Sequence, residues 1–167
     1  MTHQEGIARC LSSILSLDAE TLAIFRRGNP FDKLLRSFDE FNSEGKGLYK
    51  NQRARNHYKM SVAAFAAYES GVKINDLYAE HCVPVALTIQ KLLTAPQKDT
   101  ASILAILQEN EVVVITREEQ IRIDAAVHRG GLGLRNRMPE GGVGCSRLDA
   151  AGIKIAPETL GNTLLVK

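Results

Sequence analysis

The run EVVVIT at residues 111–116 constrains the fold of this chain more than any other segment. Its β-branched residues form a stretch too short for a helix, so the run predicts a buried strand. The segment IKIA at residues 153–156 is predicted to be its partner. Most other periodic segments have helical spacing. The sequence therefore predicts a mostly α (α+β) fold with one small two-stranded sheet.

Several helices follow from apolar spacing and from their end signals. The first 45 residues predict a small helical subassembly. The longest helical pattern runs from Leu48 to Ser70, with Gly71 as a left-handed terminator. Three shorter helices are predicted to begin at Pro84, at Asp99 or Thr100, and after a capping box of Thr116 with Glu119.

Residues 129–146 are too rich in glycine for a regular element, and we expect a long mobile loop there. Loops longer than about 12 to 15 residues in compact domains are usually functional or disordered. The alternatives for this one are a phosphate-binding loop and a plain flexible connection. The whole chain, residues 1–167, is predicted to be a single domain.

Composition excludes several classes of protein. With 167 residues, 44% hydrophobic residues and a formal net charge of +2, the chain has the composition of one globular domain rather than a disordered segment. No stretch reaches the roughly 18 apolar residues that span a bilayer, and no signal peptide is recognisable. We expect a cytoplasmic protein that does not bind membranes. Its three cysteines, Cys10, Cys82 and Cys145, are far apart, so we expect them to be reduced.

Glu80 and His81 form the first candidate site, in the stretch AEHCVPV. In a nuclease an imidazole accepts a proton from the attacking water, while one or two acids hold a divalent cation against the scissile phosphate. This chemistry predicts His81 as general base and Glu80 as a second catalytic residue. Predicted ligands of a Mg²⁺ cofactor are Glu80, Glu118 and Glu119. The structural alternative is that Glu80 precedes a helix start and that Glu118 and Glu119 are first-turn acids.

The stretch AEHCVPV resembles the acid-His-x-x-Pro stretch of His-Me finger (HNH) nucleases, and residues 112–123 resemble the strand and helix that carry the second metal-side residue in that family. The resemblance implies that His81 is the base, and that Glu119 or Gln120 stands where the family places a His or Asn. Two features depart from the family. Residues 86–111, with two predicted helices, replace a short loop, and Gln120 is a poor metal ligand. The alternatives are a rearranged site, a degenerate site without chemistry, and an accidental likeness.

A basic segment supports nucleic-acid binding. Five cations lie within residues 46–59 without an acid, and tyrosine and histidine rings between them could stack on bases. A solvated helix face is the alternative. The predicted nucleic-acid contacts are Lys46, Lys50, Arg53, Arg55, His57, Lys59, Arg129, Arg135 and Arg137.

Three functions are compatible with these features. The first is a metal-dependent nuclease, or a degenerate nuclease-like protein that acts on nucleic acid. The second is a non-catalytic accessory or inhibitor protein of a mobile element, for example of anti-CRISPR type, which binds nucleic acid or a nucleoprotein complex. The third is an interaction module that forms a homodimer through the apolar segment VAAFAAY.

Overall fold

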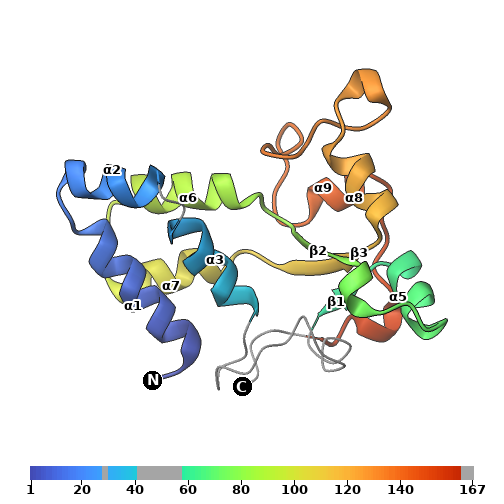
Figure 1. The fold of residues 1–167 in the computed structure, drawn as a ribbon, viewed down its shortest axis with the longest axis horizontal. Helices are drawn as coiled ribbons and strands as arrows, with labels where there is room; N and C mark the ends of the chain where they lie inside the picture. The colour runs from blue at the N-terminus through green and yellow to red at the C-terminus, as the bar shows by residue number, and fades with distance from the viewer. Residues whose placement is uncertain (28–29, 41–57, 163–167) are drawn as a thin grey trace.

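The computed structural model describes residues 1–27, 30–40 and 58–162, and these ranges are mostly helical with one small sheet (Figure 1). This confirms the predicted α+β class. The helices are α1 (His3–Leu15), α2 (Ala19–Arg27), α3 (Pro30–Glu40), α5 (Val62–Glu69), α6 (Val85–Thr94), α7 (Thr100–Gln108), α8 (Arg117–Asp124) and α9 (Ser146–Ala150). The strands are β1 (Lys59–Met60), β2 (Tyr78–His81) and β3 (Val112–Ile115), and the 3-10 turns are η1 (Ile74–Asp76), η2 (Val127–Arg129) and η3 (Pro157–Thr159). None of the helices in the described ranges has the length and apolar character that a membrane span requires.

One hydrophobic core lies among the helices on one side of the molecule (Figure 1). Helix α1 packs against α3 and α7, and α6 packs against α3 and α7. Leu11, Phe31 and Leu92 are fully buried in this cluster. Helices α1 to α3 therefore share their core with α6 and α7, which lie between β2 and β3 in the sequence.

The sheet has the strand order β1-β3-β2, with β3 in the centre. Strand β3 runs parallel to β1 and antiparallel to β2, with Val113 opposite both Lys59 and Glu80. Val112 and Val114 face a core that includes α5, whereas Val113 and Ile115 face a core that includes α8 and α9. Because both faces of β3 are covered, its sequence is a continuous apolar run rather than an alternating one.

The predicted two-stranded pairing of residues 111–116 with 153–156 is wrong. Both edges of β3 are taken by β1 and β2. Residues 153–156 instead lie beside the end of β1, where Ile155 forms an isolated antiparallel bridge with Ser61 and the Ala156 amide donates to the Met60 carbonyl at 2.8 Å. Strands β1 and β2 could not be predicted from the sequence, because they are short and carry polar residues. They are strands because they pair with β3.

The helix predicted from Leu48 to Ser70 is confirmed over Val62–Glu69, which form α5, but it is wrong just before that helix. Residues 59–60 form β1, and Ser61 begins α5 by accepting a hydrogen bond from the Ala64 amide at 3.0 Å. Residues 41–57 lie outside the described ranges. Gly71 does follow the helix with a φ of 96°, which confirms it as the left-handed terminator.

The glycine-rich segment has no regular element between Gly130 and Cys145, as predicted. It is not a loose loop, however. Amides of residues 132–134 donate to carbonyls of α8 and its C-terminal end, and Leu134 is buried in the core beneath that helix. These contacts hold the first part of the loop against α8.

Candidate functional site

A cavity of about 600 Å³ lies where β2, α8, the start of α6 and the glycine-rich loop meet. It is lined by four of the predicted site residues: Glu80, His81, Arg129 and Arg135. The charged side chains that complete its lining are Asp32, Arg36, Asp124 and Arg147. Segments from both halves of the chain thus form one pocket in which four arginines accompany three carboxylates.

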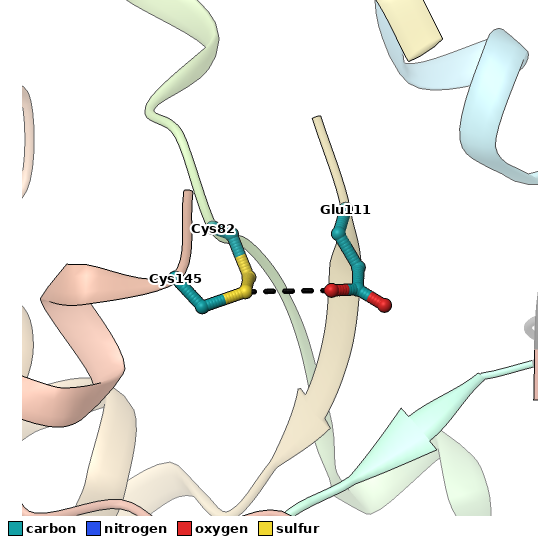
Figure 2. Close-up of side chains that lie close together, drawn as sticks. All are labelled: Cys82, Glu111 and Cys145. Atoms are coloured by element: carbon teal, nitrogen blue, oxygen red, sulfur yellow. Dashed lines mark hydrogen bonds between the residues drawn. A yellow bond between two sulfur atoms is a disulfide. The ribbon is translucent and has the colours of Figure 1, made fainter. Parts of the chain in front are cut away.

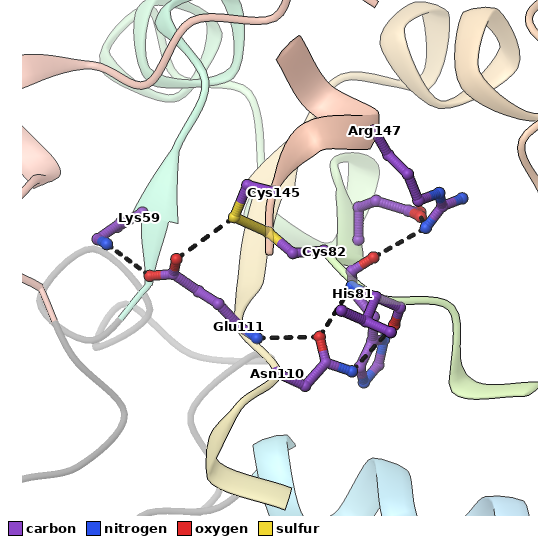
Figure 3. The surroundings of a disulfide bond; sticks show 9 residues. Lys59, His81, Cys82, Asn110, Glu111, Cys145 and Arg147 are labelled. Carbon is purple, nitrogen blue, oxygen red and sulfur yellow. Dashed lines mark hydrogen bonds and ion pairs between the residues drawn. A yellow bond between two sulfur atoms is a disulfide. The ribbon is translucent and has the colours of Figure 1, made fainter. Parts of the chain in front are cut away.

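Glu80 lies on β2 and is 6% exposed. Its Oε1 accepts a hydrogen bond of 2.6 Å from Arg147 Nη1. The same nitrogen donates to the His81 carbonyl at 2.9 Å (Figure 3). Arg147 Nη2 lies 3.5 Å from Asp124 Oδ1. Burial raises the pKa of Glu80, and the charge of Arg147 opposes that shift. The Glu80 carboxylate is therefore the counterion of a buried arginine.

His81 ends β2, and its side chain, only 12% exposed, lies at the pocket wall. Its Nε2 lies 3.0 Å from Oδ2 of Asp39, near the C-terminal end of α3. Burial raises the pKa of Asp39, while the hydrogen bond and charge of His81 lower it. A carboxylate that fixes one ring nitrogen also fixes the orientation of the imidazole. No sequence signal marks Asp39 as a site residue, because it lies 42 positions from His81 in a helix with other acids.

Glu118 and Glu119 do not line the pocket. Glu118 is exposed. Glu119 completes the capping box of α8 by accepting a hydrogen bond from the Thr116 amide at 2.8 Å. It also accepts a hydrogen bond from the Ser61 hydroxyl at 2.6 Å. Glu119 is therefore a capping residue of α8, which was the structural alternative to its role as a metal ligand. Because the oxygens of Glu80, Glu118 and Glu119 do not gather at one point, these residues do not fit a shared Mg²⁺ site.

The predicted nucleic-acid contacts divide into three groups. Lys46, Lys50, Arg53, Arg55 and His57 lie outside the described ranges. Lys59 pairs with Glu111 at 2.7 Å, and Arg137 donates to the Gly133 carbonyl at 2.8 Å within the loop. Arg129 and Arg135 line the pocket, are exposed, and form no ion pair with any other described residue.

Cys82 and Cys145 form a disulfide, so the prediction that they are reduced is wrong (Figure 2). Cys10 is free and exposed, as expected. No local pattern predicts this bond, because the two residues are 63 positions apart and only the tertiary fold brings the start of α9 against the end of β2. In the chain-entropy account a disulfide at that separation stabilises the fold by about 4 kcal/mol.

Gln120 and Arg147 also line the pocket, although neither was among the predicted site residues. Gln120 donates to Asp124 Oδ2 at 2.6 Å, and both residues line the pocket. Arg147 was missed because a single arginine in a short helix carries no sequence signal. No family profile, curated protein or solved structure matches this chain, so its site is interpreted from its own geometry.

Proposed function

We propose that this chain is a nuclease-like protein that binds the phosphate backbone of nucleic acid in the pocket beside β2. The observation that carries the proposal is the pair of exposed arginines, Arg129 and Arg135, at a pocket whose carboxylates already have partners. Arg36 pairs with Asp32 at 2.8 Å, and Arg147 pairs with Glu80 at 2.6 Å. The guanidinium groups of Arg129 and Arg135, which form no ion pair with another described residue, can each donate two hydrogen bonds to the oxygens of a phosphate.

The order of elements around the pocket supports the nuclease-like part of the proposal. His81 ends β2, β3 runs antiparallel beside it, and α8 follows β3 and packs against β2. This is the strand, strand and helix order expected from the resemblance to His-Me finger nucleases, with α6 and α7 in place of the short loop. Gln120 in the pocket and Glu80 in a buried ion pair favour a degenerate site that binds rather than cleaves.

Metal-dependent cleavage is the second candidate function. It is favoured by the contact between His81 and Asp39, since a carboxylate that orients an imidazole is a common support for a general base. In this alternative His81 would take a proton from the attacking water, and a divalent metal would need ligands other than a shared set of Glu80, Glu118 and Glu119.

Binding is tested with labelled single-stranded DNA, duplex DNA and RNA in EDTA, measured by fluorescence anisotropy over a range of salt concentrations. We expect binding that weakens with salt, because phosphate contacts release counterions. The double variant Arg129→Ala/Arg135→Ala should bind at least about tenfold more weakly, with a salt slope lower by about 0.7 to 0.9 per lost contact. Arg9→Ala/Lys73→Ala removes the same charge from exposed positions outside the pocket and serves as the control. Equal losses in both double variants would contradict the pocket as the binding site.

Cleavage is tested with the same substrates and plasmid DNA in Mg²⁺, Mn²⁺ or EDTA, beside the variant His81→Ala. Binding without product in every lane supports the degenerate site. Metal-dependent product that disappears in His81→Ala supports the second candidate. Neither binding nor product would overturn both.

A further inference from the structure

We propose that the reduced form of this protein binds zinc through Cys82, Cys145 and Glu111. In the structure the two sulfurs and one carboxylate oxygen lie within 4.8 Å of one another (Figure 2). Among the described residues, this is the one group of three cysteine, histidine or acidic side chains that gathers so closely. The site is separate from the Mg²⁺ role considered above and shares none of its predicted ligands.

The sheet sets two of the three ligands side by side. The Cys82 amide donates to the Glu111 carbonyl at 2.7 Å, which extends the antiparallel pairing of β2 and β3 by one step. The third ligand, Cys145, is the residue immediately before α9. Because the ligands come from three separate parts of the chain, the site exists only in the folded state.

Glu111 is oriented toward the sulfurs by a second interaction. Lys59 Nζ lies 2.7 Å from Glu111 Oε1, while Oε2 lies 3.5 Å from Cys145 Sγ (Figure 3). One carboxylate oxygen is thus held by a cation on β1, and the other faces the cysteines. Hydrogen bonds from outside a metal site commonly orient its ligands in this way.

The ligand types select the metal. Two thiolates and a carboxylate suit zinc, with Zn–S distances of about 2.3 Å and Zn–O distances of about 2.0 to 2.2 Å. A tetrahedral ion with those bond lengths separates its ligand atoms by roughly 3.3 to 3.8 Å, so the reduced sulfurs need only move apart locally. Cys145 and Glu111 are half-buried, which leaves solvent access for a water as the fourth ligand.

Reduction of the disulfide must precede zinc binding. A dithiol gives two electrons and two protons to the Cys82–Cys145 disulfide and itself becomes a disulfide, which leaves two protein thiols. Zinc then binds the two sulfurs and displaces both thiol protons to solvent. The oxidised protein offers no thiolate at this position, so the disulfide and the zinc site exclude each other.

Zinc binding is measured on the full chain, once oxidised and once reduced and then freed of reductant without air. Zinc is titrated against a chromophoric chelator, and cobalt is used in parallel because thiolate ligands give it a charge-transfer absorption. We expect one zinc ion to be retained per reduced chain and none by the oxidised chain. Glu111→Gln should weaken retention by the reduced chain about 10-fold or more. Cys10→Ser, which removes the exposed cysteine, should leave it unchanged.

Thermal unfolding of the unmodified chain supplies a readout that needs no variant. Zinc should raise Tm of the reduced form and leave Tm of the oxidised form unchanged, because a ligand of the folded state alone stabilises it. Equal retention by oxidised and reduced chains, or undiminished retention by Cys82→Ser/Cys145→Ser, would overturn the proposal. These outcomes are independent of nucleic-acid binding, which is measured in EDTA.

Discussion

At the scale of single residues, the partner of a side chain decides its role. Glu80 was predicted to be catalytic because it precedes His81, but its carboxylate lies 2.6 Å from a buried arginine. Arg147 is 1% exposed and stands 67 positions further along the chain. A buried guanidinium requires a counterion, so this pair is a structural requirement of the pocket whatever the pocket binds.

Arg147→Met should lower the free energy of unfolding by about 3 to 5 kcal/mol, because it leaves Glu80 buried without its partner. The double variant Arg147→Met/Glu80→Gln should be more stable than Arg147→Met alone, since the unpaired carboxylate is gone as well. Urea unfolding followed by circular dichroism measures both changes.

Lys91→Met is the matched control for this prediction. Lys91 pairs with Glu109 on the surface, where both side chains are more than half exposed. Such pairs contribute about 0 to 1 kcal/mol. Similar losses in Arg147→Met and Lys91→Met would show that the buried pair does not hold the fold together.

At the scale of elements, local signals identified helices better than strands. The capping boxes of α1 and α8 form within four residues of sequence, and the predicted start of α8 is confirmed. Strands β1 and β2 have two and four residues, and their pairing partners lie far away in the sequence. Helix ends are set by local hydrogen bonds, whereas strands depend on long-range ones.

The stability that Asp99 gives to α7 should depend on pH. Its carboxylate accepts hydrogen bonds from the side chain and amide of Ser102 and from the Ala101 amide, and these hold its pKa below the usual 3.8. A lowered folded-state pKa stabilises the protein above pH 3.8, and that contribution is lost as the pH falls through the folded-state value. Asp99→Ala should therefore be less stable than the unmodified chain at pH 7, by a margin that shrinks below pH 3.8.

Asp99→Asn provides the comparison, because an asparagine caps a helix without a titrating group. Urea unfolding at pH 7 and at a pH below 3.8 measures all three proteins. A gap between Asp99→Ala and the unmodified chain that stays constant across this range would contradict an ionised cap.

At the scale of the whole molecule, α5 packs on its own chain. The segment VAAFAAY was predicted to offer an apolar face to a second copy. In the structure Ala64 is buried, and Phe65 and Tyr68 pack against the core on one face of the sheet. The two largest side chains of the segment, Phe65 and Tyr68, therefore already contact the rest of the chain.

We expect light scattering after gel filtration to give a constant mass near the 18.3 kDa of one chain over a hundredfold range of concentration. Val62 is the largest apolar side chain of α5 left exposed, at 51%. If the mass rises toward twice that value with concentration, Val62→Ser should abolish the rise when α5 is the interface. A rise in mass with concentration would contradict a monomer, whether or not Val62→Ser abolishes it.

The sequence by itself determined the α+β class, the burial of residues 112–115 and the helix starts at Asp99 and Thr116, because apolar runs and caps act over a few residues. It also identified His81, Arg129 and Arg135, which the fold brings to one pocket. Only the tertiary structure decided that Arg147 neutralises Glu80, that Asp39 contacts His81 and that Cys82 joins Cys145. Each of these pairs spans more than 40 positions. Such contacts arise when separate elements pack together, and no local pattern in the sequence records which partner each side chain meets.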